Sequence, residues 1–215
     1  AAYLHITTNE TIAGTQWHTI PYDCGIPLIA DMSSDILSRQ LDFNKFDLIY
    51  AGAQKNMGAA GVNLVVINKN ILGRVERAIP TILDYRNHIK EESMLNTPPV
   101  FAVYVAMLTL RWLKKMGGLA TVEKLNDEKA SLFYSTLDSL PIFKGPIAKE
   151  DRSKMNAIFI MDNPELEKEF LERIMAFEEM GKNANMILVY ELLGNPAYIP
   201  ANELTEETAQ EELDR

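Results

Sequence analysis

Four short apolar runs in the first third of the chain predict β-strands. They cover residues 4–7, 27–30, 48–51 and 62–67, and Gly, Pro, Asn or Asp residues bound them. Three of these runs are almost continuously hydrophobic, as is typical of the buried strands of parallel sheets. We therefore expect a mostly parallel sheet that is covered on both faces.

From residue 98 onward the pattern changes to one that favours helices. Residues 100–113 contain no helix breaker, and Pro98 and Pro99 suit the first turn of a helix. Gly117 and Gly118 suit its end. The pattern therefore predicts one long helix between the two prolines and the two glycines.

Three further elements are expected after this helix. Residues 119–137 carry apolar side chains three and four positions apart, which predicts a second helix. We also expect a strand over residues 156–161 and an amphipathic helix over residues 164–180. The chain thus combines a first part rich in strands with a second part rich in helices.

Two of the predicted strands end at residues that can carry chemistry. Asp31 directly follows the run 27–30, and Lys55 follows the run 48–51 inside a turn bracketed by glycines. Open α/β sheets bind ligands at the carboxyl ends of their strands, so we expect Asp31 and Lys55 to face one crevice. Pyridoxal-phosphate chemistry needs such a pair, because a lysine binds the aldehyde and an acid keeps the pyridine nitrogen protonated.

Each candidate residue also has an ordinary structural interpretation. A lysine in a glycine-rich loop is most often a surface residue. Asp31 could cap a helix that starts near Ser33. Thr11, taken alone, is most simply a structural turn residue, and Asn96 and Thr97 precede two prolines at a plausible helix entry.

Five sequence blocks, in the same order, resemble the phosphoserine aminotransferase family of fold-type I, class V pyridoxal-phosphate enzymes. They are Asn-Glu-Thr-Ile-Ala-Gly at 9–14, Ala-Asp-Met-Ser-Ser-Asp-Ile-Leu-Ser-Arg at 30–39, Ile-Tyr-Ala-Gly-Ala-Gln-Lys-Asn at 49–56, Ser-Met-Leu-Asn-Thr-Pro-Pro at 93–99 and Arg-Ser-Lys-Met-Asn at 152–156. Five blocks in register rarely arise by chance. The resemblance extends from about residue 4 to about residue 180.

The resemblance implies an α/β fold of fold-type I, with a mostly parallel sheet flanked by helices and the start of a smaller α+β domain. It assigns residues 1–125 to the large cofactor-binding domain and residues 126–180 to the small C-terminal domain, and it leaves residues 181–215 as an unassigned acidic tail. The implied reaction is an amino transfer between glutamate and 3-phosphohydroxypyruvate in serine biosynthesis, which gives 2-oxoglutarate and O-phosphoserine. Small amino and keto acids are therefore the expected substrates.

The same resemblance implies roles for four residues of this chain. Lys55 binds pyridoxal phosphate covalently and later moves a proton, and Asp31 pairs with the pyridine nitrogen. Thr11 offers its hydroxyl to the phenolic oxygen of the cofactor. Gln54, beside the lysine, donates to the cofactor's phosphate.

Asn96 and Thr97 imply a partner subunit. In the family this pair reaches the cofactor phosphate that the neighbouring subunit holds. The resemblance therefore predicts a homodimer in which each subunit completes the site of the other.

The chain departs from the family at both ends. The family carries Gly-His-Arg and Gly-Gly-x-Arg segments that contact the substrate's phosphate and carboxylate, but residues 181–186 read Gly-Lys-Asn-Ala-Asn-Met. The family's larger domain also begins well before its equivalent of Tyr3. We therefore expect a partial copy of the enzyme. Arg39, Arg86 and Arg152 are candidate cations for substrate anions, although no motif selects among them and surface salt bridges are their simpler role.

Two rival functions follow from these departures. One keeps the cofactor and changes the substrate, as in other class V aminotransferases. The other is a truncated, catalytically silent module that dimerises or binds through the family's sheet. Retention of the cofactor, with its absorbance band, separates an enzyme from a silent module.

Charge and composition argue against several other classes. The formal net charge of −9 disfavours a surface for nucleic acid or anionic membranes. No apolar run reaches the roughly 18 residues that a membrane span needs. The single cysteine, Cys24, fits a reducing cytoplasm. His5, His18 and His88 are scattered along the chain, so the sequence predicts no metal site.

Overall fold

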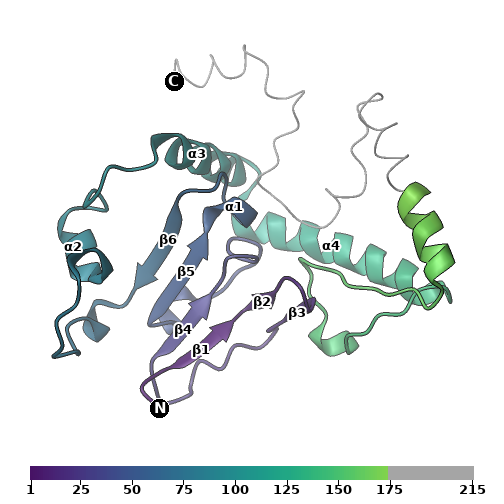
Figure 1. Cartoon of the computed structure of the whole chain (residues 1–215), viewed down its shortest axis with the longest axis horizontal. Coiled ribbons are helices and arrows are strands. Elements are labelled where there is room, and N and C mark those ends of the chain that lie inside the picture. The colour runs from purple at the N-terminus through teal and green to yellow at the C-terminus, as the bar shows by residue number, and fades with distance from the viewer. Residues whose placement is uncertain (174–215) are drawn as a thin grey trace, which may run out of the picture.

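The structure, a computed structural model, describes residues 1–173. Its main sheet has the strand order β1-β4-β5-β6, formed by Leu4–Thr7, Leu28–Asp31, Leu48–Gly52 and Asn63–Ile67 (Figure 1). Strands β1, β4 and β5 run parallel, and β6 pairs antiparallel with β5. The four predicted strands and the mostly parallel sheet are confirmed.

Two long helices follow the sheet. Helices α3 (Val100–Lys115) and α4 (Gly118–Ser139) confirm the two predicted helices, although α3 begins after the two prolines rather than on them. Gly117 separates them with a φ of 101°, a left-handed conformation that glycine adopts without steric cost. The shorter elements are α1 (Ala53–Asn56), α2 (Tyr85–Lys90) and the 3-10 turns η1 (Phe43–Lys45), η2 (Lys69–Ile71), η3 (Thr81–Leu83) and η4 (Lys149–Asp151). Among residues 1–173, no helix has the length and apolar character that crossing a membrane requires.

The hydrophobic core lies against one face of the main sheet. Buried side chains of three adjacent strands point to this face, namely Ile6, Leu28, Ala30, Ile49 and Ala51. Met32, Ile36 and Phe46, from the segments between strands, complete the same cluster. Full burial of a large apolar side chain contributes about 1.5–3 kcal/mol. This face therefore anchors the three strands.

The prediction that both faces of the sheet are covered is wrong for the described part of the chain. On the other face His5 and Thr7 are exposed, and Asp31 and Tyr50 are partly exposed. These positions alternate with buried ones along β1, β4 and β5. The apolar runs concealed the alternation because Ile29, which is also apolar, lies on the open face.

Helix α4 runs unbroken through residue 125. The predicted boundary between domains therefore falls inside a helix, and the division into two domains stays a prediction. The helix is tied to the segment after β4, because Nδ2 of Asn126 donates to the carbonyl of Ser38 at 3.0 Å. In Figure 1, α4 extends from near α1 to the right of the main sheet.

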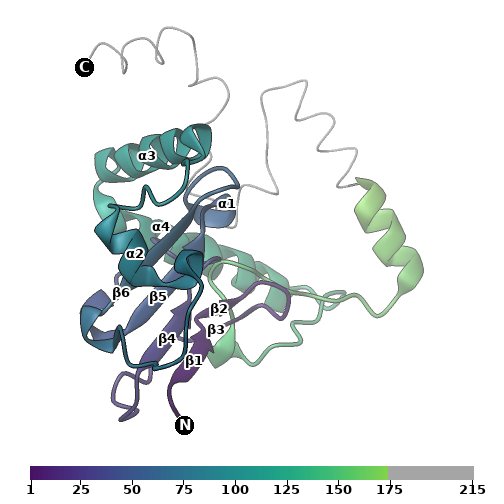
Figure 2. The same cartoon turned by 60° about the vertical axis from the view of Figure 1, so that its left-hand side comes forward.

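A small hairpin after β1 was not predicted. Its strands, β2 (Asn9–Glu10) and β3 (Thr15–Gln16), pair antiparallel, and they are too short and too polar to stand out as apolar runs. The segment after α4 lies beside this hairpin in both views (Figures 1 and 2). Arg152 forms an isolated antiparallel bridge with Thr15 there.

The strand predicted over residues 156–161 is wrong, since Ile160 makes only an isolated bridge with Lys144. The apolar residues of this segment are used for side-chain packing instead. The ring of Phe159 packs against three other aromatic rings, those of Phe133, Phe143 and Phe170. The helix predicted over residues 164–180 is present over 164–173. Its remainder and the predicted tail, 181–215, lie outside the described residues.

Candidate functional site

Lys55 lies immediately beyond the carboxyl end of β5. It is the third residue of α1, so it stands in a one-turn helix rather than in the open turn that the glycines predicted. The turn after α1 packs against α3, because a Cβ at Gly58 would lie 3.1 Å from the backbone nitrogen of Ala106. The strand and the packed turn fix the backbone of Lys55, while the residue itself is exposed.

Thr11 meets Lys55 across 44 residues of sequence. It lies in the loop between β2 and β3, and its Oγ1 accepts a hydrogen bond from Nζ of Lys55 at 2.8 Å. Glu10 shapes the loop, because its carbonyl accepts the N–H of Gly14 and its carboxylate accepts the N–H of Ile12. The fold thus brings together two of the predicted cofactor residues.

Asp31 lies at the same edge of the sheet, at the end of β4. It is the register partner of Thr7 on β1 and of Tyr50 on β5. Its Oδ1 accepts the backbone N–H of Ser33 at 2.9 Å, which closes a local turn, and no helix starts at Ser33 as the alternative interpretation had expected. Because β4 and β5 are parallel neighbours, Asp31 and Lys55 follow adjacent strand ends, as predicted.

Two side chains near Asp31 were not singled out from the sequence. Tyr50 stands beside Asp31 on β5, and its hydroxyl lies 3.1 Å from Nε2 of His5. Burial, together with the charge of Asp31 and a hydrogen bond with it, raises the pKa of Tyr50. The two-residue alternation along β5 is the signal that could have placed Tyr50 on the face of Asp31.

Gln54, the predicted phosphate donor, precedes Lys55 in α1. It is exposed, and its amide folds back over the end of β5, where a Cβ at Gly52 would lie 2.8 Å from Oε1 of Gln54. The fold therefore gathers an amine, a hydroxyl, a carboxylate and an amide at one edge of the sheet.

Asn96 and Thr97 stand apart from this group. They lie on the segment between α2 and α3, and both are exposed. Nδ2 of Asn96 donates to the carbonyl of Thr97 at 3.2 Å. Within residues 1–173, no hydrogen bond joins either residue to Thr11, Asp31 or Lys55. Their predicted role toward a partner subunit stays a prediction.

The three candidate arginines each form an ion pair with an aspartate. The pairs are Arg39 with Asp35 at 3.1 Å, Arg86 with Asp84 at 2.6 Å and Arg152 with Asp138 at 2.8 Å. Arg152 also stacks over the ring of Tyr134, with its guanidinium carbon 4.8 Å from the ring centroid. The expected surface salt bridge is confirmed for Arg86, whose side chain is 54% exposed, whereas the side chains of Arg39 and Arg152 are largely buried in their ion pairs.

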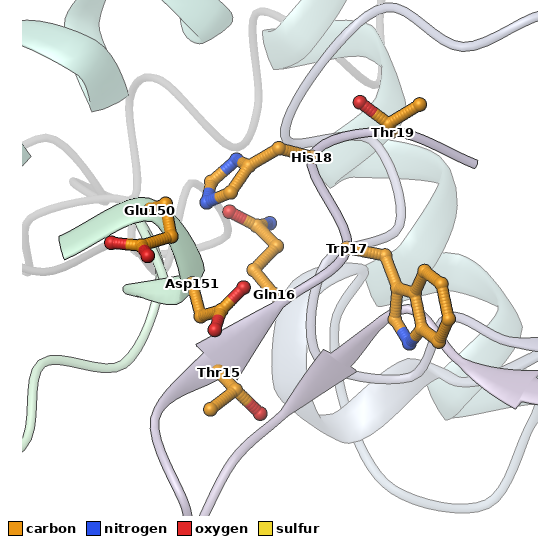
Figure 3. Close-up of a pocket in the computed structure, with 7 residues that line it drawn as sticks. All are labelled: Thr15, Gln16, Trp17, His18, Thr19, Glu150 and Asp151. Atoms are coloured by element: carbon orange, nitrogen blue, oxygen red, sulfur yellow. The ribbon is translucent and has the colours of Figure 1, made fainter. Parts of the chain in front are cut away.

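A pocket of about 460 Å³ lies between β3 and η4. Figure 3 shows its lining residues, which are Thr15, Gln16, Trp17, His18, Thr19, Glu150 and Asp151. The side chains of His18 and Asp151 lie close to Gln16, whereas the ring of Trp17 points away from η4. Two carboxylates and no lysine or arginine line this pocket, so it does not suit a ligand that carries a phosphate. The carboxyl edge of β4 and β5 remains the candidate site.

Known proteins are similar to this chain in sequence. Residues 1–194 match the family model of the class-V aminotransferases. The phosphoserine aminotransferase of Flavobacterium johnsoniae is 61% identical over 165 residues, which are 77% of this chain and 46% of that protein. The chain spans about half the length of the curated relatives that it matches.

Solved structures share the fold. The phosphoserine aminotransferase of Bacillus circulans subsp. alkalophilus has a TM-score of 0.77 and 38% identity, over 100% of this chain and 58% of that one. The PLP-bound phosphoserine aminotransferase of Trichomonas vaginalis has a TM-score of 0.72 and 43% identity, over 77% of this chain and 48% of that one. These likenesses confirm the predicted fold-type I architecture.

Proposed function

We propose that this chain, which belongs to the class-V aminotransferase family, carries the catalytic lysine of a phosphoserine aminotransferase. The reaction would move an amino group between glutamate and 3-phosphohydroxypyruvate, with 2-oxoglutarate and O-phosphoserine as products. One observation carries the proposal: Nζ of Lys55 contacts Oγ1 of Thr11 at the end of the strand next to that of Asp31. Relatives that bear the name phosphoserine aminotransferase, with 61% and 48% identity, support this choice of substrate.

The residues at the carboxyl edge fit pyridoxal phosphate. This group presents an aldehyde, a pyridine nitrogen, a phenolic oxygen and a phosphate, and the edge offers a side chain for each. We assign Lys55 to the aldehyde, Asp31 to the nitrogen, Thr11 to the phenolic oxygen and Gln54 to the phosphate. When bound, pyridoxal phosphate supplies an electron sink for the α-carbon of the substrate.

Lys55 is the residue that moves protons in this proposal. Its exposed amine can be approached by a substrate α-carbon, while the hydroxyl of Thr11 holds Nζ at 2.8 Å. Holding a reacting group in place removes part of the entropy cost of the reaction. An amine held in this way can accept a proton from one atom of the bound reactants and deliver it to a different atom. This proton transfer is general acid–base catalysis.

Asp31 supplies a fixed negative charge beside the ring nitrogen. Its Oδ1 is held by the N–H of Ser33, and Tyr50 stands next to it on the same face of the sheet. A carboxylate in this place favours the protonated form of the nitrogen. The attraction is stronger in an enclosed site than in water, because the effective dielectric constant is lower.

The proposal includes a homodimer in which Asn96 and Thr97 reach the cofactor of the partner. Both residues are exposed, so a second subunit can approach them. The start of α3, next in sequence, carries two strongly exposed apolar side chains, Val100 at 70% and Phe101 at 74%. Contiguous exposed apolar surface is typical of protein–protein contacts, and a second copy of the chain would cover it.

We also propose the division into a large domain, residues 1–125, and a small domain, residues 126–180. The location of the main sheet and of Lys55 in the first part supports this division. A cytoplasmic location is proposed as well. The single cysteine supports it, since a reducing compartment does not favour disulfides.

The function is tested with the complete protein, purified in the presence of pyridoxal phosphate. Incubation with glutamate and 3-phosphohydroxypyruvate should give equal amounts of 2-oxoglutarate and O-phosphoserine, measured by chromatography. A preference for a different keto acid would support another class-V aminotransferase. Absence of both amino transfer and cofactor retention would support the silent module and contradict the proposal.

A further inference from the structure

Residues 152–156 have no role in the proposed reaction, yet they form hydrogen bonds with the hairpin that carries Thr11. Ser153 is 1% exposed, and its Oγ donates to Oδ1 of Asn9. Its backbone N–H donates to the carbonyl of Gly14 at 2.8 Å. Oδ1 of Asn156 accepts a hydrogen bond from Nδ2 of Asn9 at 2.8 Å. The block therefore holds the hairpin on both sides of Thr11.

Asn9 is the residue at which these contacts meet. It is 2% exposed, and its Nδ2 donates to Oγ of Ser34 at 2.9 Å as well as to Asn156. Oγ of Ser34 in turn donates to the carbonyl of Asn9 at 2.7 Å. Both amide hydrogens and the amide oxygen of Asn9 thus have partners, as burial of a primary amide requires.

A glycine allows the close approach that these contacts need. Gly14 has a φ of 68°, and a Cβ at this position would overlap the side chain of Ile158. Any other residue would be strained there and would push the hairpin away from the segment that follows Ser153. The close contact is therefore built into the backbone as well as into the side chains.

The contacts of Asn9 connect the two segments that carry Thr11 and Asp31. Asn9 lies two residues before Thr11, and its partner Ser34 lies three residues after Asp31. The Oγ1 of Thr11 lies 2.8 Å from Nζ of Lys55, so a shift of the loop displaces this hydroxyl directly. A displacement of about 1 Å can cost on the order of 10²-fold in rate.

We propose that Asn9 is a positioning residue, held by Ser153 and Asn156, that keeps Thr11 in contact with Lys55. This inference rests on the proposed function, in which Thr11 and Lys55 hold the cofactor. Asn9 does not touch the amine of Lys55, so its effect passes through the backbone of the loop.

A double-mutant cycle in the complete protein tests this role. Asn9→Ala removes all the side-chain contacts of Asn9, and Thr11→Val removes the hydroxyl with little change of shape. We expect Asn9→Ala to raise the dissociation constant of pyridoxal phosphate about 10-fold, as loss of a supporting group around metal ligands does. In the Thr11→Val background the same change should raise it by less than about twofold, because the positioned hydroxyl is already absent.

Asn126→Ala is the matched control. Asn126 is also a buried asparagine, 4% exposed, whose amide donates to the carbonyl of Ser38 and contacts Sδ of Met155 at 3.8 Å, but it makes no hydrogen bond to Asn9 or to the hairpin. This variant should leave the dissociation constant unchanged. An equal rise in Asn126→Ala, or an equal effect of Asn9→Ala in both backgrounds, would indicate general loosening of the fold and would overturn the proposal.

Ser153→Ala covers the case in which Asn9→Ala does not fold. It removes one of the contacts to Asn9 and should raise the dissociation constant in the same direction, by a smaller factor. The rise should again disappear in the Thr11→Val background. A folded Ser153→Ala protein with unchanged affinity would count against the proposal.

A second readout does not depend on the cofactor. The rate at which trinitrobenzenesulfonate modifies Lys55 is followed by peptide mass mapping, with the exposed Lys69 as internal reference. Asn9→Ala should shift the Lys55 rate to the value found for Thr11→Val. If the wild-type protein does not bind pyridoxal phosphate, the proposed function fails while this readout still tests the contact. A Lys55 rate that Asn9→Ala leaves unchanged would overturn the inference.

Discussion

Thr11, Asp31 and Lys55 are held by the interior of the chain, whereas Asn96 and Thr97 stand on an exposed segment. Asp31 ends β4 and Lys55 follows β5, two strands of the main sheet whose other face forms the hydrophobic core, and Thr11 lies in the hairpin loop that contacts Lys55. The other two lie between α2 and α3, where both are exposed to solvent. We call the first three the interior group, because the elements that carry them are anchored within the chain although Lys55 itself is exposed, and the other two the outward group.

The difference shows which part of the site a single chain can build. The contact between Lys55 and Thr11, at 2.8 Å, forms within one chain. By contrast, the amide of Asn96 donates to the carbonyl of the next residue in sequence, so its hydrogen bond ties it to no distant part of the described chain. Their proposed role in the site of a partner comes from the resemblance to the family, and their exposure leaves them accessible to a second subunit.

The largest effect is expected at Lys55, in the interior group. Lys55→Ala in the complete protein should abolish amino transfer, because Lys55 is the lysine that the fold places in contact with Thr11 and at the strand end next to that of Asp31. Formation of 2-oxoglutarate measures this. Lys69→Ala, which changes an exposed lysine in η2, is the matched control and should keep near wild-type activity. Continued amino transfer by Lys55→Ala would mean that another residue acts as the catalytic lysine.

Asp31→Asn should come next in size. The amide keeps the shape of the side chain but loses the charge, so turnover should fall by about 10²-fold or more while cofactor affinity changes much less. Steady-state kinetics and equilibrium dialysis measure the two quantities on the same preparation. Equal and modest losses in both would indicate that Asp31 serves only as the cap of Ser33.

The outward group is tested by subunit complementation. The double variant Asn96→Ala, Thr97→Ala should fold normally but bind pyridoxal phosphate weakly. Co-expression with Lys55→Ala should then restore a fraction of the active sites, because a mixed dimer has one site with Lys55 from one subunit and an intact pair from the other. Activity and the composition of the dimers are measured together. Mixed dimers without any restored activity would contradict the shared-site model. Asn96 and Thr97 would then serve only as the residues that lead into α3.

The smallest effect is expected for the ion pairs that Asp138 forms with Arg152 and Lys149. Hydrogen bonds from Arg152 and Lys149 lower the pKa of Asp138 from its ordinary 3.8 to about 2. A carboxyl whose pKa is lower in the folded state stabilises the fold above pH 3.8, and this contribution is lost as the pH falls toward 2. Asp138→Asn should therefore be less stable than wild type at pH 6, by a small amount because the pair is partly exposed.

Urea unfolding at a series of pH values measures this difference in the free energy of unfolding. The gap between wild type and Asp138→Asn should stay constant from pH 6 to about pH 5 and narrow below pH 3.8. A gap that does not change with pH would mean that the carboxylate charge of Asp138 adds nothing to the fold.

Part of the fold could be predicted because it follows from local patterns. The four strands of the main sheet are apolar runs, and α3 and α4 lie between clear helix signals. The hairpin of β2 and β3 could not be found in this way, because its strands are polar and two residues long. The prediction of a strand over residues 156–161 was wrong because the ring of Phe159 packs against other aromatic rings rather than in a sheet.

The candidate site was predictable to a similar extent. Asp31 and Lys55 could be placed at one edge, since both follow apolar strands. The contact between Thr11 and Lys55 follows from the docking of the hairpin, which no local pattern encodes. The same holds for Asn9 and Ser153, which are 144 residues apart in sequence and hydrogen-bonded in the fold.

The most direct test of the central claim is reduction of the complete protein with borohydride in the presence of pyridoxal phosphate, followed by peptide mass mapping. Reduction traps the covalent link between an amine and the cofactor's aldehyde, so it reports which lysine holds the group. We expect one labelled lysine per chain, Lys55, and no label at this stoichiometry in Lys55→Ala. A label on another lysine, or full labelling of Lys55→Ala, would contradict the account.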